Sequence, residues 1–209
     1  MRVNLVRTLT LSCALSMVAM PAIAKQPHNV EITPLIGYRF GGDFDFIVEP
    51  DNYRIDLKDK ISYGLLTAWS YDRKRQAELL ISHYNTNFTA SGNSLGAGSG
   101  LSITYAHLGG NVPVSNGPIP LFVTGGFGLT HLVPQASQLS SETRFSANIG
   151  LATKIALSER VSLRLDSRLY GTLFNSDSAI FCDGGNCAIH ISSNIWLQTE
   201  VSAGVSYRF

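Results

Sequence analysis

The stretch that decides the fold is WLQTEVSAGVSYRF, residues 196–209. Apart from Thr199, apolar residues occupy every second position from Leu197 to Phe209, and polar residues such as Gln198 and Glu200 lie between them. Strict alternation is typical of a β-strand whose two faces meet different surroundings. Because chain ends usually carry polar residues, an aromatic residue at position 209 predicts that this end contacts something apolar.

The same alternation recurs along the chain. Seven further segments show it, at residues 29–40, 60–71, 76–84, 100–110, 120–132, 143–157 and 159–172. The longer connections are residues 41–60, 85–99, 133–142 and 175–193. They broadly alternate with short ones at residues 72–75 and 157–160 and with residues 111–120, which are of moderate length like residues 133–142. Eight strands with long loops at one end and tight turns at the other predict an all-β, antiparallel up-and-down barrel.

The first 24 residues read as a signal peptide. Arg2 and Arg7 precede an apolar run, and the sequence Ala22-Ile23-Ala24 ends it as an A-x-A cleavage site. We therefore expect cleavage after Ala24 and a barrel domain over residues 25–209. Cleavage removes two arginines and no acidic residue, which changes the net charge from +1 to −1. A charge so near zero gives no reason to expect a nucleic-acid partner.

Two cysteines remain in the exported chain, in the sequence CDGGNC. Cys182 and Cys187 are close in sequence, and an exported protein meets an oxidising compartment. The spacing predicts a disulfide that closes a tight loop. Two free thiols, or half of a zinc site, are the alternatives, although no second pair with zinc-like spacing stands out.

Three observations indicate which barrel face meets lipid. The polar faces are rich in small residues, and only 15% of all residues are charged, whereas a water-facing wall carries many Lys and Glu. Most of the five lysines lie outside the strands, whose polar positions favour arginine. Aromatic residues near strand ends fit an interfacial girdle. These residues are Tyr38, Phe40, Trp69, Tyr71, Tyr207 and Phe209. We therefore predict a transmembrane β-barrel with its apolar face in lipid.

The same assignment applies to residues 100–110 and to the histidines of the strands. In residues 100–110 it turns Leu101, Ile103 and Tyr105 outwards. It puts three histidines at the membrane interface, namely His83, His107 and His131.

The polar faces predict a charged barrel interior. Its members would be Glu31, Arg39, Glu78, Arg144, Lys154, Arg164, Asp166, Arg168, Glu200 and Arg208. Since an eight-stranded barrel is only wide enough for side chains to fill it, these charges must pair with one another. Position along the strands suggests two pairs, Arg168 with Glu200 and Glu31 with Arg208. The set predicts a packed polar plug, and the alternative is a gated narrow path.

The sequence resembles a known family. The ending Tyr207-Arg208-Phe209 and the stretches EITPLIGYRFGG, SETRFSANIGLATKI and ERVSLRLDSRLYGT are similar to small eight-stranded outer-membrane barrels of Gram-negative bacteria, grouped with the OmpA-type transmembrane domain. The resemblance implies a place in the bacterial outer membrane. It also implies contact with outer-membrane lipid and lipopolysaccharide, and Tyr207 and Phe209 as a signal for the barrel-assembly machinery.

The resemblance leaves several functions open, because the grouping includes structural anchors, adhesins and small channels. We expect a non-enzymatic barrel with a structural or surface-interaction role, no cofactor and no metal. The alternatives are a narrow channel for small or apolar solutes and a lipid-modifying enzyme. The last rests on His190 and Ser192, with Asp177 and Asp183 upstream, because lipid A deacylases use a similar His-x-Ser pattern.

Overall fold

The computed structural model describes residues 30–42, 44–48, 51–72, 74–90, 100–115, 117, 119–135, 140–174, 179–183, 186–190 and 195–209. It describes only the backbone of the strand residues 44–48, 51–57, 88–90, 179–183 and 186–190. The expected signal peptide and its cleavage site after Ala24 lie outside the described residues.

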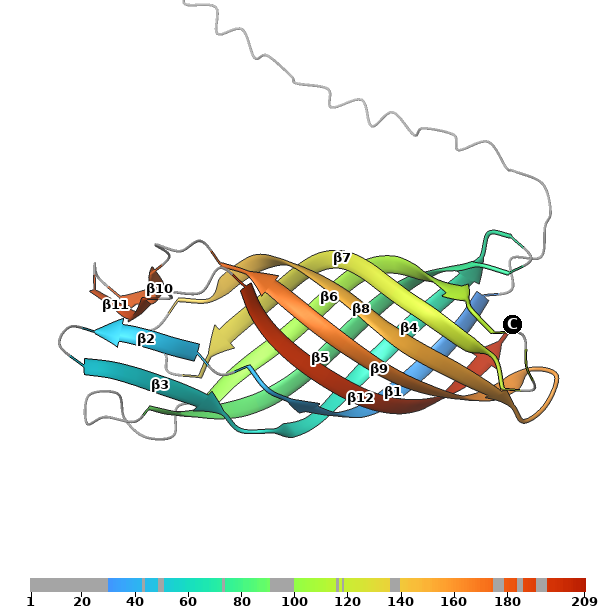
Figure 1. Cartoon of the computed structure of the whole chain (residues 1–209), viewed down its shortest axis with the longest axis horizontal. Helices are drawn as coiled ribbons and strands as arrows, with labels where there is room; N and C mark the ends of the chain where they lie inside the picture. Colours follow the sequence, from blue (N-terminus) through green and yellow to red (C-terminus); the bar gives the residue numbers. More distant parts are fainter. Residues whose placement is uncertain are drawn as a thin grey trace, which may run out of the picture.

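Eight long antiparallel strands form a closed barrel wall (Figure 1). They are β1 (Val30–Phe40), β4 (Lys60–Ser70), β5 (Gln76–Ala90), β6 (Gly100–Pro113), β7 (Leu121–Pro134), β8 (Glu142–Ala156), β9 (Val161–Leu173) and β12 (Ile195–Arg208). Their order is β5-β4-β1-β12-β9-β8-β7-β6, and β6 pairs with β5 to complete the circle. The predicted eight-stranded up-and-down barrel is confirmed.

The seam between the first and last barrel strands needs a glycine. β1 and β12 pair antiparallel, with Gly204 opposite Leu35. A Cβ at Gly204 would lie 2.2 Å from the carbonyl oxygen of Pro34, far inside a normal contact. β12 therefore closes the barrel, and its backbone approaches β1 closely because position 204 has no side chain.

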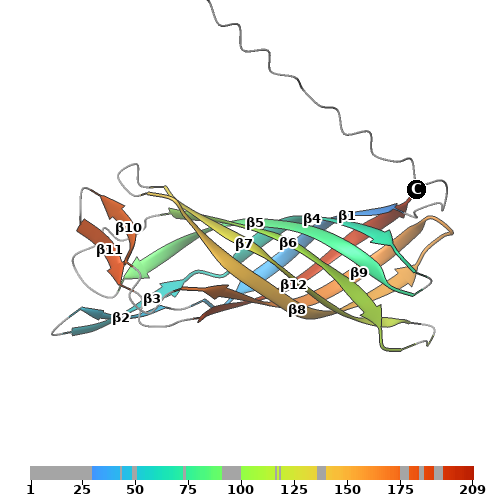
Figure 2. The same ribbon diagram turned by 90° about the horizontal axis from the view of Figure 1, so that it is seen from above.

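The two ends of the barrel differ, as Figure 2 shows. Two hairpins, β2 (Phe44–Val48) with β3 (Asp51–Leu57) and β10 (Ala179–Asp183) with β11 (Asn186–His190), extend beyond one end. β3 also pairs with the end of β5. The other end carries the shorter turns and the C-terminus. In barrels of this kind the longer loops are extracellular and the short turns periplasmic.

The short turn between β4 and β5 is held by Asp72. Its Oδ1 accepts the backbone N–H groups of Lys74, at 2.8 Å, and Arg75, at 2.7 Å. These hydrogen bonds keep the pKa of the Asp72 carboxyl below its ordinary value. The ionised carboxylate therefore fixes a tight periplasmic turn.

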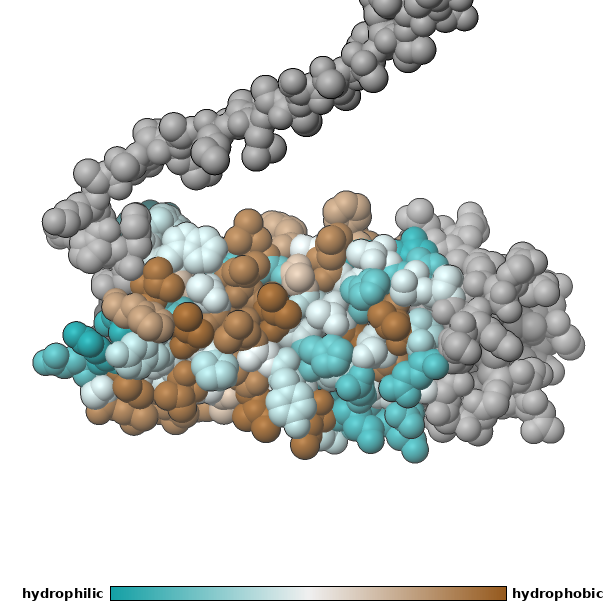
Figure 3. All heavy atoms as spheres, turned by 180° about the vertical axis from the view of Figure 1, so that it is seen from behind, coloured by the Kyte–Doolittle hydropathy of each residue, from teal (hydrophilic) through white to brown (hydrophobic). Residues whose placement is uncertain are grey.

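The outer face of the barrel is apolar over its middle. Phe127 is 79% exposed and Phe145 is 74% exposed, and many aliphatic side chains share this face. Figure 3 shows hydrophobic side chains gathered over the middle of the barrel and hydrophilic ones towards both ends. Such a belt suits the hydrocarbon of a bilayer, where a closed barrel leaves no strand edge unpaired. Among the described residues, no helix is long and apolar enough to cross a membrane.

One strand corrects the sequence prediction. In β6 the side chains of Leu101, Ile103 and Tyr105 are buried in the barrel, not turned towards lipid, and the outward positions include Ser102 and Thr104. These outward residues lie at the extracellular end of the strand, where the wall leaves the hydrocarbon and polar side chains are tolerated. The interior at that level is filled by apolar and aromatic groups, so hydropathy alone reverses the faces.

Candidate functional site in the barrel interior

Four charged side chains form a cluster in the periplasmic half of the interior. Arg164 donates from Nη2 to Glu78 Oε1 at 2.9 Å and from Nε to Asp166 Oδ2 at 2.6 Å. Arg168 donates from Nη2 to Glu78 Oε2 and to Asp166 Oδ1, both at 2.9 Å. All four side chains are almost fully buried. Two positive and two negative charges cancel here, as burial requires.

A second set of contacts lies nearer the periplasmic rim. Lys154 donates from Nζ to Glu31 Oε1 at 2.6 Å and to Gln76 Oε1 at 2.8 Å. Arg208 lies 3.7 Å from Glu31 Oε2, and its side chain is 48% exposed. Arg208 is thus a rim residue rather than an interior one, because the barrel opens to water at this end.

Arg39 occupies a cage higher in the barrel. Its Nε donates to Glu200 Oε2 at 2.9 Å, and Nη2 donates both to the same carboxylate oxygen and to Ser82 Oγ. Three aromatic rings surround the guanidinium carbon, with centroids 4.2–4.9 Å away. They belong to Tyr84, Tyr105 and Tyr170. A cation enclosed by rings and neutralised by a carboxylate is stable in a dry interior.

The tyrosine cage is itself held in place. Tyr105 donates its hydroxyl to Gln198 Oε1 at 2.8 Å, and the amide nitrogen of Gln198 donates to the hydroxyl of Tyr84. Tyr105 and Tyr170 pack with ring centroids 4.7 Å apart. Side chains from β1, β5, β6, β9 and β12 therefore converge on one level of the barrel.

His107 was predicted to lie at the membrane interface, but its side chain is buried in the barrel interior. The oxygen Oδ1 of Asn148 accepts from Arg168 at 3.0 Å, which turns the Asn148 amide nitrogen towards His107 Nδ1 at 2.6 Å. Nδ1 is therefore an acceptor, so the ring proton is on Nε2 and is donated to Ser146 Oγ at 2.7 Å. An activated serine nucleophile needs the opposite direction of donation. The neutral His107–Ser146 pair is thus suited to packing.

The extracellular end of the interior is closed mainly by apolar groups. The rings of Phe174 and Trp196 pack with centroids 6.3 Å apart, and Trp196 Nε1 donates to the carbonyl oxygen of Gly42 at 2.8 Å. Arg144, predicted as an interior charge, lies 3.2 Å from Glu142 with its side chain about one-quarter exposed. It is a partly solvated residue at this end of the barrel.

Of the two pairs suggested by sequence, Glu31 with Arg208 is present and Arg168 with Glu200 is not. Arg168 and Glu200 are cross-strand neighbours on β9 and β12, yet their charged groups turn to different partners. Glu200 binds Arg39, while Arg168 binds Glu78 and Asp166. Partners across the barrel compete with register neighbours, and sequence spacing carries no signal for them.

Several interior residues were not singled out from the sequence. Tyr84 and Tyr170 share the parity of charged interior residues on their own strands, which could have indicated their place. Gln198 carries the same signal on β12. Tyr105 and His107 gave no such signal, because β6 has no interior charge to set its parity.

Two predicted features lie on segments whose side chains are not described. The backbone of Cys182 pairs in register with that of Cys187 in the β10–β11 hairpin, and the disulfide stays a prediction. The side chains of His190, Ser192, Asp177 and Asp183 also lie outside the described set. Within that set, no group of three or more His, Cys, Asp or Glu residues could hold a metal ion.

A closed eight-stranded wall with an apolar exterior and a paired polar interior defines the transmembrane β-barrel class. The chain belongs to the outer membrane protein beta-barrel domain family, whose model matches residues 10–209. Solved structures share the fold at low sequence identity. The Neisserial surface protein NspA has 10% identity and a TM-score of 0.58, over 86% of this chain and 97% of that one.

Two further structures are similar. The outer membrane protein OprG from Pseudomonas aeruginosa has 11% identity and a TM-score of 0.52, over 88% of this chain and 97% of that one. The outer membrane protein AlkL, solved in DMPC bilayers, has 14% identity and a TM-score of 0.50, over 91% and 95%. No curated protein matches the chain. Membership of this family places the protein in the bacterial outer membrane, as predicted, and the solved structures share its fold.

Proposed function

We propose that this barrel is a non-enzymatic outer-membrane protein with a structural or surface-interaction role, and that its interior carries no solute. The Arg39 cage supports this proposal. A passing ion would have to displace a guanidinium bound to Glu200 and Ser82 and covered by three rings. Breaking a buried ion pair of this kind costs about 3–5 kcal/mol.

Planar lipid bilayers test this role against the narrow channel. Purified protein is expected to give no steady conductance steps, and steady steps would favour the channel instead. The double variant Arg39→Ala/Glu200→Ala removes the plug without leaving an unpaired charge, so it is expected to raise the frequency of brief openings. The exposed pair Asp72 and Arg75 supplies the control, Asp72→Ala/Arg75→Ala, which should remain silent.

The buried His107–Ser146 pair supports a non-enzymatic role, because its hydrogen bond runs in the wrong direction for serine activation and both side chains are buried. The test is mass spectrometry of lipid A from cells with and without the protein. Identical lipid A is expected. Loss of an acyl chain would favour a lipid-modifying enzyme that uses His190 and Ser192.

We further propose that the barrel-assembly machinery recognises Tyr207 and Phe209. Both rings are exposed on the periplasmic end of the outer wall, and they contact each other edge to face with centroids 4.9 Å apart. The Phe209 backbone N–H donates to the carbonyl oxygen of Val30 at 3.0 Å. The terminal residue is thereby held against the wall while its ring remains available to a partner.

A further inference from the structure

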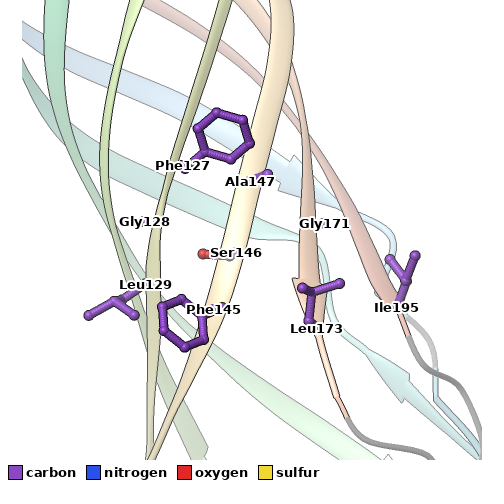
Figure 4. A pocket seen from close by; sticks show the side chains of 9 residues that line it. All are labelled: Phe127, Gly128, Leu129, Phe145, Ser146, Ala147, Gly171, Leu173 and Ile195. Atoms are coloured by element: carbon purple, nitrogen blue, oxygen red, sulfur yellow. The ribbon is translucent and has the colours of Figure 1, made fainter.

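A groove of about 730 Å³ crosses the outer wall of the barrel over β7, β8, β9 and β12 (Figure 4). Figure 4 shows Ala147 and Gly171 between two phenyl rings on one side and two aliphatic side chains on the other. The four wall residues are Phe127, Phe145, Leu173 and Ile195. The groove faces outwards, so the medium that fills it is the membrane.

The residues at the floor of the groove are small, although the backbone packing there does not require small residues. Ala147 and Gly171 are register neighbours on β8 and β9. A Cβ added at Gly171 would find its nearest atoms at 3.5 Å, on Leu197, and 3.7 Å, on Ile195, which are ordinary contacts. This differs from Gly204, where a Cβ would collide with the neighbouring strand. The fold therefore tolerates a larger residue at 171, and the open space is a property of the surface.

A polar pair lies next to the groove on its extracellular side. Leu129, which also lines the groove, is in register with Phe145, and His131 is in register with Thr143 two residues further along both strands. Two strand residues span about 7 Å, and they return the side chains to the same face. His131 Nδ1 and Thr143 Oγ1 are hydrogen-bonded at 2.8 Å, and both side chains are exposed. Within the described residues, His131 Nε2 has no partner.

From the membrane centre outwards, this surface presents apolar space and then exposed hydrogen-bonding groups. The acyl chains and the polar headgroup of an outer-leaflet lipid follow in the same order. We propose that this surface binds one lipopolysaccharide molecule through its lipid A. An acyl chain would lie over Ala147 and Gly171, and a lipid A phosphate would accept a hydrogen bond from His131 Nε2–H, while the Thr143 hydroxyl donates to Nδ1 and holds the ring. The site lies in the extracellular half of an outer-membrane barrel, the leaflet that lipopolysaccharide occupies. It is also continuous with the lipid-facing belt of the wall.

The test uses the full barrel, refolded in nonionic detergent and titrated with purified hexa-acylated lipid A under native mass spectrometry. We expect a one-to-one complex for the wild type. Ala147→Leu combined with Gly171→Ala fills the floor and should weaken binding about tenfold, and His131→Ala should weaken it about threefold. Gly171→Ala alone tests the groove with the least change to packing. Heat-modifiable gel mobility confirms that each variant is folded before titration.

Two matched variants are the controls. Ala203→Leu adds the same side chain to the outer face of β12 away from the groove, and His83→Ala removes a histidine that makes a similar bond to Thr104, at 2.9 Å, on a wall without the groove. Both should bind lipid A within about twofold of wild type. Equal losses in the controls, or no wild-type complex, would overturn the proposal. So would equal affinity for dipalmitoyl phosphatidylethanolamine, or a barrel dimer that the groove variants abolish.

Discussion

Arg39 and Glu200 are cross-strand partners at the seam where the first and last barrel strands pair, and their side chains form an ion pair inside the barrel. The pair joins residues at opposite ends of the sequence. It also anchors the level at which three tyrosine rings fill the lumen. One contact thus links the closure of the wall to the closure of the interior.

Glu200→Ala is expected to lower the free energy of unfolding by about 3–5 kcal/mol, because it leaves the Arg39 guanidinium buried without its carboxylate. Urea titration of the refolded barrel in detergent, followed by gel mobility, measures the change. The control is Ser202→Ala on the same face of β12. An unchanged midpoint for Glu200→Ala would show that the pair is not needed for stability.

The double variant Arg39→Met/Glu200→Ala should be less destabilised than the sum of the two single variants. It removes both charges together, so no uncompensated charge stays in the interior. The same urea titrations give the coupling energy. Strict additivity would mean that the two side chains act independently despite their contact.

The two cations that approach Glu31 should differ in their contribution to stability. Lys154 lies 2.6 Å from Glu31 with its side chain 10% exposed, whereas Arg208 lies 3.7 Å away and is half-exposed. Arg208→Ala is expected to cost less than about 1 kcal/mol, as for surface pairs, and Lys154→Ala distinctly more. Denaturant unfolding of the two variants decides, and equal losses would contradict the distinction.

Asn148→Asp is expected to change the tautomer of His107. A carboxylate in place of the amide accepts the proton from Nδ1, so Nε2 becomes the acceptor and Ser146 the donor. Long-range ¹⁵N–¹H correlation spectra of labelled barrel in micelles report which nitrogen carries hydrogen. They should show Nε2–H in the wild type and Nδ1–H in the variant. Nδ1–H in the wild type would refute the assigned direction of the network.

Deletion of Phe209 should reduce the amount of barrel that reaches the outer membrane more than it reduces the stability of inserted barrel. Phe209 is 69% exposed and its ring contacts only Tyr207 among the described aromatic groups, so little packing is lost. Membrane fractionation measures the first effect and urea unfolding the second. Tyr71→Ala, which alters an exposed aromatic at the same end, is the control. Normal membrane levels of the truncated protein would contradict an assembly role.

The barrel could be predicted from sequence because lipid requires apolar side chains on the outer face of each strand, while the inner face can be polar. In β8, Phe145, Ile149 and Leu151 face outwards and Ser146 and Asn148 face inwards, as the alternation indicated. Charged residues strengthened the rule, since a membrane-facing arginine in β9 would be costly. Strand existence and orientation followed from these two signals.

The interior contacts could not be predicted in the same way. β6 has no charged residue in its barrel segment, and its polar outward positions lie beyond the hydrocarbon, so Tyr105 and His107 were placed on the wrong face. The choice of Arg39 rather than Arg168 by Glu200 depends on side-chain reach across the lumen. Strand tilt and stagger set that reach, and neither can be derived from the local spacing of residues in the sequence.

The interior ion pairs also constrain the order in which this protein can assemble. Glu78 on β5 meets its two arginines on β9, and Arg39 on β1 meets Glu200 on β12. An open sheet of the first few strands would therefore carry these charges into hydrocarbon without their partners, which membranes penalise heavily. Early strands gain most of their electrostatic compensation only when late ones arrive, so insertion and closure are expected to proceed together, with no stable half-barrel in the bilayer.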